Sequence, residues 1–164
     1  MSGSVDLAAI TVARAAWSRL VEPGDTLAGA VVAALGPLDS ISWLRRAVPV
    51  VTAGGSVAGS LPGLADATAR RLDRAVGGWA TRWPGLDPRR DLEAIARLGG
   101  RVLVPEGPGW PVSLADLGAA MPACLWVRGA ADLAALVTRS VAVIGARACT
   151  HYGEHVTVEM AASL

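Results

Sequence analysis

The sequence has no lysine, phenylalanine, asparagine or glutamine, so all 15 basic side chains are arginines and six of its seven aromatic residues are tryptophans. The 15 basic and 14 acidic residues leave a net charge of +1, which excludes a strong field drawing the whole chain to nucleic acid. With 52% hydrophobic residues, the chain is also not a disordered tail. Its 164 residues have room for one ordinary domain, or for a small domain and part of another.

Cysteine is scarce, and Cys124 and Cys149 lie outside any Cys-x-x-Cys pattern, so we expect no disulfide framework. The longest uncharged stretch, residues 47–65, has nearly the length of a membrane span, but two prolines and four glycines interrupt it. We therefore expect a Gly/Pro-rich linker near residues 47–63, and no membrane segment. The first residues lack the charged start and apolar run of a secretory signal, so the predicted location is the cytoplasm.

The first 98 residues have the apolar periodicity of helices. Asp25 has the residue type of a helix N-cap, and Gly36-Pro37 is a stop signal. Asp87-Pro88 begins another helix, with proline at the first helical position. The predicted helices cover residues 5–21, 26–35, 39–44, 64–83 and 87–98.

From residue 99 onward, short apolar runs typical of strands replace this pattern, at residues 101–105, 123–128 and 140–145. The run Ser140–Gly145 is almost continuously apolar, which favours a strand buried on both faces of a parallel sheet. A parallel strand needs a neighbour that a later crossover usually supplies. The sequence therefore predicts a mixed α/β protein, with a helical domain over 1–98 and the truncated beginning of a second domain over 99–164.

The segment after that run, Gly145-Ala146-Arg147, has the character of an anion site. A buried strand would lead through a glycine turn to a helix N-terminus, whose free N–H groups and dipole attract phosphate. Arg147 can bind phosphate oxygens through two parallel hydrogen bonds, and Tyr152 can stack on a base. An ordinary strand–loop–helix joint with one solvated arginine explains the pattern equally well. The segment is not a Gly-x-Gly-x-x-Gly fingerprint, because Arg147 occupies the second glycine position.

The overlapping stretch His151-Tyr152-Gly153-Glu154-His155 matches the His-x-x-Glu-His pattern of some zinc enzymes. Gly153 weakens the helix that such a site needs, and the chain holds no third ligand downstream. We therefore expect no metal. No convincing nucleophile arrangement or carboxylate pair is evident either, so we expect no catalytic residues and no cofactor.

Tryptophans and arginines elsewhere in the chain have two explanations each. The six tryptophans would suit a platform for stacking bases, but with no phenylalanine they must also supply most of the aromatic core, which we favour. Arg70, Arg71 and Arg74 would suit contacts to a DNA backbone, although a solvated helix face is the more common role of such a run.

Residues 139–147, Arg-Ser-Val-Ala-Val-Ile-Gly-Ala-Arg, together with Thr150 and Tyr152-Gly153, resemble the Gly-Ser/Ala-Arg segment of the DNA-processing protein A (DprA/Smf) family. The N-terminal helices, with Glu22–Asp25, are similar to those of actinobacterial members. Three further segments resemble the family's lead-in to its Rossmann domain, in the same order: Leu98–Pro105, Trp110-Pro111 with Leu114, and Pro122–Gly129.

This resemblance implies a SAM-like helical domain followed by the incomplete start of an extended Rossmann fold. Family members bind single-stranded DNA in a groove of the Rossmann domain, protect it, and load the RecA recombinase during natural transformation. Full-length members form homodimers, which is doubtful for this shorter chain. No catalytic residue is implied. The implied DNA contacts are Gly145, Ala146, Arg147, Tyr152 and Gly153.

The sequence departs from the family at Glu106–Gly109, where members usually have Gly-Asp before the aromatic-proline pair. Two other functions remain open. One is a Rossmann-like nucleotide-binding hydrolase that shares the same opening strand and glycine loop. The other is a helical protein-interaction module over residues 5–98 that carries a non-functional remnant.

Overall fold

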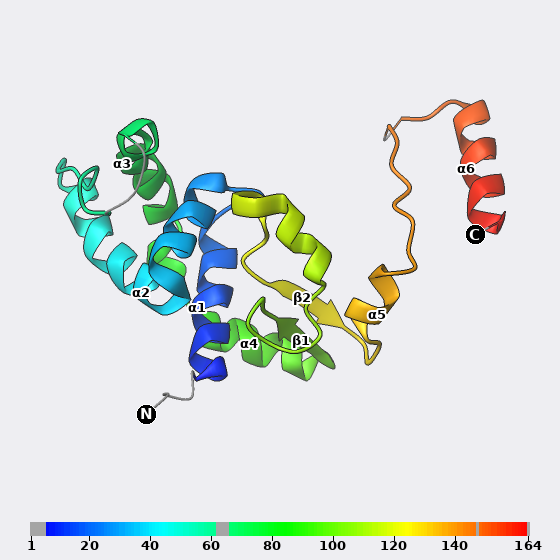
Figure 1. Cartoon of the computed structure of the whole chain (residues 1–164), viewed down its shortest axis with the longest axis horizontal. Coiled ribbons are helices and arrows are strands. Elements are labelled where there is room, and N and C mark those ends of the chain that lie inside the picture. Colours follow the sequence, from blue (N-terminus) through cyan, green and yellow to red (C-terminus); the bar gives the residue numbers. More distant parts are fainter. Residues whose placement is uncertain (1–5, 62–65, 147, 164) are drawn as a thin grey trace.

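The computed structural model describes residues 6–61, 66–146 and 148–163. These residues form helices and a two-stranded antiparallel sheet, which confirms the mixed α/β class (Figure 1). The elements in chain order are α1 (Leu7–Leu20), α2 (Thr26–Thr52), α3 (Asp66–Ala80), the short helix η1 (Trp83–Gly85), α4 (Pro88–Arg97), β1 (Gly100–Leu103), η2 (Val112–Ala120), β2 (Leu125–Arg128), α5 (Leu133–Val137) and α6 (His151–Ser163).

Aspartate side chains cap four of the described helices at their N-termini, α1, α2, α4 and α5, as the sequence predicts for Asp25 and Asp87. The Asp25 carboxylate accepts hydrogen bonds from the backbone N–H groups of Leu27 and Ala28, at 3.0 and 3.1 Å. Asp87 accepts one from Arg90 N–H at 3.1 Å, and Asp6 caps α1 in the same way. These local bonds satisfy N–H groups that the first helical turn leaves without partners, so the helix starts are fixed by short-range chemistry.

The predicted helix stop at Gly36 is confirmed, because Gly36 has a non-helical backbone (φ 77°, ψ 165°) that separates two helical parts of α2. The predicted linker from residue 47 begins too early, because the second helical part continues to Thr52. Pro49 lies inside the second half, where it removes one backbone hydrogen bond. Burial of Trp43 and Leu44 in the core outweighs that loss. The irregular connection occupies residues 53–61, and residues 62 and 63 of the predicted linker lie outside the described ones.

Within the described ranges, α2 is the one helix long and apolar enough, by length and composition alone, to cross a membrane. Core helices pass the same test, and α2 is bent at Gly36 and contributes seven buried residues. The longest uncharged stretch, residues 47–65, overlaps only the C-terminal end of α2, from Ala47 to Thr52.

The core lies among α1, α2 and α3, where Trp17, Leu44 and Leu72 are fully buried. The rings of Trp17 and Trp79 meet edge to face, with centroids 5.2 Å apart and planes at 88°, an arrangement that aromatic pairs prefer. The predicted core role is confirmed for four tryptophans, whereas Trp83 is half-buried and Trp126 is 36% exposed. The four buried tryptophans are Trp17, Trp43, Trp79 and Trp110.

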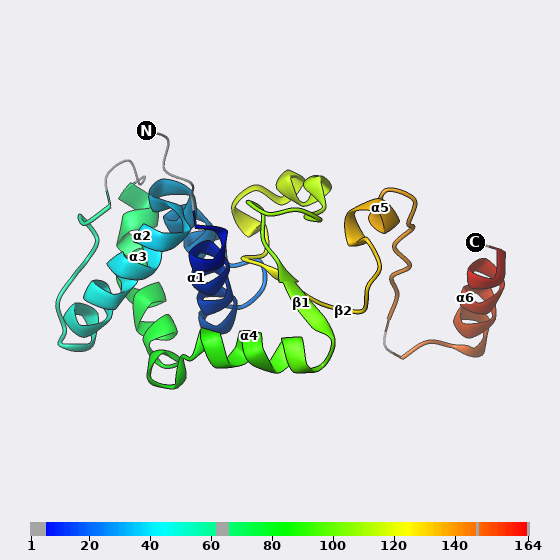
Figure 2. The same ribbon diagram turned by 90° about the horizontal axis from the view of Figure 1, so that it is seen from below.

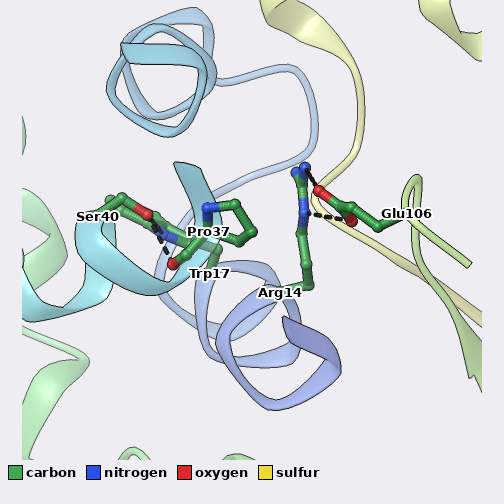
Figure 3. Close-up of polar contacts among 5 residues, drawn as sticks. All are labelled: Arg14, Trp17, Pro37, Ser40 and Glu106. Carbon is green, nitrogen blue, oxygen red and sulfur yellow. Dashed lines mark hydrogen bonds and ion pairs between the residues drawn. The ribbon is translucent and has the colours of Figure 1, made fainter. Parts of the chain in front are cut away.

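The indole N–H of Trp17 connects α1 to the second half of α2 (Figure 3). Trp17 Nε1 donates to Ser40 Oγ at 2.9 Å, and Ser40 Oγ donates to the carbonyl of Pro37 at 2.9 Å. Both Trp17 and Ser40 are 0% exposed. These two hydrogen bonds satisfy the polar atoms of both buried side chains. They also hold the second part of α2, after Gly36, against α1.

β1 and β2 form a hairpin in which Gly100 pairs with Arg128 and Leu103 with Leu125. Both strands were predicted. The predicted strand at residues 140–145 is wrong, because this segment has no regular structure and Val141 and Ile144 are 66% and 93% exposed. A strand satisfies its backbone groups through a paired neighbour, and no described strand lies beside this run. The described sheet is therefore antiparallel rather than parallel.

Two side-chain contacts attach the hairpin region to α1. Arg14 binds Glu106 through two atoms, with Nη2–Oε1 at 2.6 Å and Nε–Oε2 at 3.3 Å (Figure 3). Trp126 Nε1 donates to Ser18 Oγ at 3.0 Å. Glu106, at the position where the sequence departs from the DprA pattern, thus pairs with a helix of the predicted first domain. The boundary between residues 98 and 99 stays a prediction.

Replacing Ser40 with alanine should test the Trp17 contact. Ser40→Ala leaves the buried indole N–H of Trp17 without its partner, which we expect to lower the free energy of unfolding by about 1–3 kcal/mol. Ser60→Ala is the matched control, because Ser60 makes the same two bonds, to Trp43 and Val57, at an exposed position. Water can replace that hydroxyl, so its loss should cost less. Urea unfolding of both variants gives the comparison, and equal losses would contradict the assignment.

Asp73 should make stability depend on acid pH. Its carboxylate accepts hydrogen bonds from Val57 N–H and Ser56 Oγ, both at 2.7 Å, and these bonds hold its pKa below the ordinary 3.8. Because the folded pKa is lowered, the stabilisation is present at neutral pH and is lost as the pH falls below that value. Asp73→Asn should reduce the melting temperature more at pH 7 than at pH 3, relative to the unmodified chain. Asp39→Asn, at an exposed position of α2, is the control and should show no such difference.

Candidate nucleic-acid interface

Four of the five predicted DNA contacts lie in described residues, two of them before α6 and two in its first turn. Gly145 and Ala146 are exposed and belong to a stretch without regular structure. Tyr152, 78% exposed, and Gly153, half-buried, follow in α6. Arg147 lies outside the described residues, so its contact with DNA stays a prediction. Gly145 thus lies before α6, and Tyr152 and Gly153 lie in its first turn.

An open hollow of about 600 Å³ occupies this junction. Gly145, Ala146 and Gly153 line it, whereas Tyr152 does not. The structure thus brings three of the five predicted residues together around one space. Glu154 also lines the hollow, and its negative charge opposes a phosphate there. A phosphate in this hollow therefore requires a cationic partner, for which the loop sequence offers Arg147.

Thr150 caps α6, a role that sequence analysis missed. Thr150 Oγ1 accepts a hydrogen bond from Gly153 N–H at 3.3 Å, and the Thr150 carbonyl accepts one from Glu154 N–H at 3.0 Å. The helix consequently begins at His151, earlier than the predicted start near Glu154. A threonine just before an apolar helix was the available signal. The cap takes up one free N–H of the helix N-terminus and fixes where the loop ends.

Gly153 lies against the residues that precede α6. A Cβ atom at this position would lie 3.4 Å from Cys149 Cβ and 3.7 Å from Thr150 Oγ1, which are ordinary van der Waals contacts. The fold alone therefore does not require glycine at this position.

The histidines of the His-x-x-Glu-His stretch pair with glutamates of their own helix. His155 Nε2 lies 3.3 Å from Glu159 Oε1, and His151 Nδ1 lies 4.0 Å from Glu154 Oε2. All four side chains are largely exposed. In the part of the chain that the structure describes, no three His, Cys, Asp or Glu side chains gather as a metal site would require.

The arginines of α3 lie far from this junction. Arg71 and Arg74 are exposed, and Figures 1 and 2 show α3 and α6 at opposite ends of the molecule. The side chain of Arg70 lies outside the described ones. The two described arginines therefore do not form one site with the loop in this structure.

Comparisons with known proteins identify a family that matches the C-terminal part of the chain. The family model described as DNA recombination-mediator protein A matches residues 101–164, which include β2, all of β1 except Gly100, and all five predicted contacts. The resemblance of this part to the DNA-processing protein A family is thus confirmed.

Curated relatives extend the match across most of the chain. A protein named "Putative DNA processing protein DprA", found in two strains of Mycobacterium tuberculosis, is 33% identical over 162 residues. The alignment covers 91% of this chain and 36% of the relative, so the chain spans about a third of the length of these proteins. No solved structure matches.

The cap at Thr150 can be tested without any ligand. None of the residues of α6 is buried, and an isolated helix of its 13 residues is marginal in water. Thr150→Ala should destabilise it by about 1 kcal/mol, a roughly fivefold shift toward the unfolded helix. Backbone chemical shifts and amide exchange of residues 151–155 report this change. Thr150→Ser keeps the oxygen and should restore the helix; a serine variant as frayed as the alanine variant would contradict the cap.

Proposed function

We propose that this chain serves DNA processing in recombination by binding single-stranded DNA at the Gly145–Arg147 loop and the first turn of α6. The observation that carries the proposal is the exposed Gly145-Ala146 backbone, which leads to a helix N-terminus capped by Thr150. This junction lies inside the segment that matches the DNA recombination-mediator protein A family.

Each part of the junction suits a different part of a nucleotide. The exposed glycine backbone lets a phosphate approach closely, and the N-terminus of α6 contributes a positive dipole end. Arg147 supplies the charge that offsets Glu154 and can bind two phosphate oxygens at once. The exposed ring of Tyr152 offers a face on which any base can stack. Binding of this kind is independent of base sequence.

The net charge of +1 limits the strength of this interaction. A chain without a broad basic surface gains little from counterion release, so we expect affinities no better than the roughly 10⁻⁴–10⁻⁶ M of non-specific binding. The junction acts as a local contact within a longer binding surface, in line with relatives that are about three times as long.

The finer biological role is also part of this proposal. Protection of incoming single-stranded DNA, loading of the RecA recombinase and dimer formation are expected of the longer relatives, in the cytoplasm where both partners occur. We propose no catalytic step for the chain, since binding and handover of DNA account for the role.

Arg147→Ala should weaken binding of a fluorescent oligo-dT to the full chain and lower its dependence on salt. Loss of one phosphate contact reduces the slope of log K against log salt by about 0.7 for single strands. Arg45→Ala, which removes an equal charge from an exposed position on α2, is the matched control. Fluorescence anisotropy at several salt concentrations measures both quantities.

The control decides what a weakened affinity means. If Arg45→Ala lowers the affinity and the slope as much as Arg147→Ala, net charge alone drives binding and the loop has no special role. If neither substitution changes binding, the site assigned to Arg147 is wrong. Circular dichroism of each variant confirms that the helices remain folded.

A further inference from the structure

A second cavity, of about 530 Å³, lies far from the loop, between the helices and the hairpin region. The C-terminal half of α1, the turn at residues 21–25 and the first half of α2 form one wall, and residues 118–126 form the other. We call this space the helix–hairpin crevice. Its volume lies in the range of small-molecule sites, which are mostly apolar with a few placed polar groups.

The charged groups that line the crevice are all engaged with partners inside the protein. Arg14 is held by Glu106 through two contacts, and Glu22 forms an ion pair with Arg82. The Asp25 carboxylate accepts from two backbone N–H groups and from Trp79 Nε1, the last at 3.0 Å. A charged ligand would find no free counter-ion among these groups and would have to give up its own hydration. The charge pattern therefore selects a neutral occupant.

The wall of the crevice contains one accessible aromatic side chain and a thiol. Trp126 is 36% exposed and lies there together with Cys124, which is 5% exposed, whereas Trp17 lies behind the wall at 0%. Burial raises the pKa of the Cys124 thiol, so the group is neutral at physiological pH. Ser18 Oγ, which accepts from Trp126, is the polar group beside them. The accessible indole of Trp126 with a hydroxyl beside it favours a planar ring that bears one hydrogen-bonding group.

A close backbone contact fixes one end of the crevice. A Cβ atom built on Gly29 of α2 would lie 1.9 Å from the Ala119 carbonyl oxygen. The end of η2 therefore rests directly on α2, and only glycine allows this approach. The wall formed by residues 118–126 is thus seated on the helix, so the crevice is a preformed space rather than a gap beneath a loose loop.

We propose that the helix–hairpin crevice binds one neutral, aromatic small molecule. Apolar cavities offer water few partners and accept aromatic guests, and the volume is enough for a ligand of two or three rings. The site is separate from the proposed DNA contacts and does not depend on them.

The test uses N-phenyl-1-naphthylamine, a neutral aromatic amine whose fluorescence rises in an apolar site. Titration of the full chain should give saturable binding of one probe per chain. Ala33→Trp places a large side chain at the rim of the crevice, whereas Ala34→Trp places the same side chain at the adjacent exposed position of α2, which does not line it. We expect Ala33→Trp to weaken binding at least tenfold and Ala34→Trp to leave it unchanged.

A measurement on the unmodified chain guards against misfolding of the variants. Cys124 lines the crevice, and Cys149 is an exposed thiol outside it. Saturating probe should slow alkylation of Cys124 by N-ethylmaleimide several-fold, with Cys149 as internal reference, as followed by peptide mass spectrometry. The proposal would be overturned if the probe showed no saturable binding, or if both tryptophan variants lost probe affinity equally. It would also be overturned if the probe protected both cysteines from alkylation equally. A dimer that dissociates on Ala33→Trp would overturn it as well, because the crevice would then be occupied by a second copy.

Discussion

The fold depends on the buried indole of Trp17, where three elements meet. Its N–H reaches Ser40 beyond the bend of α2, its ring edge meets Trp79 of α3, and its own helix supplies the attachment points for the hairpin. A tryptophan at 0% exposure contributes a large apolar area, but its N–H must also find a partner. That requirement sets the direction of the second half of α2. The break at Gly36, which separates the two helical parts of α2, therefore allows the second part to pack in this direction.

The attachment of the hairpin to α1 has a different physical character. Arg14 and Glu106 form a largely buried, two-atom ion pair, and such pairs contribute more to geometric specificity than to net stability. Breaking one would leave a charge poorly solvated, so the pair favours one arrangement of hairpin and helix over its alternatives. Arg14 also lines the helix–hairpin crevice. The ion pair therefore helps to fix the position of the crevice wall formed by residues 118–126 relative to α1.

Much of the helical part could be predicted because its signals are local. Asp25 and Asp87 cap helices through bonds to residues two or three positions away, and apolar periodicity located the helices themselves. The continuation of α2 past Pro49 could not be predicted in this way, because it depends on the burial of Trp43 and Leu44 against other helices. At the candidate site, the sequence located the glycine loop, but the Thr150 cap and the position of Glu154 in the hollow emerged only from the fold.

The exposed run from Val141 to Ile144 has a consequence for the behaviour of the protein in solution. An uncharged, β-branched segment without a paired neighbour presents free backbone groups that other chains can use as a template. This aggregation-prone run directly precedes the proposed DNA contacts. The same short segment therefore affects both the solubility of the protein and its binding of nucleic acid. A partner that covers residues 141–144 would also change the exposure of Gly145, the next residue in the chain. Aggregation and DNA binding are therefore coupled.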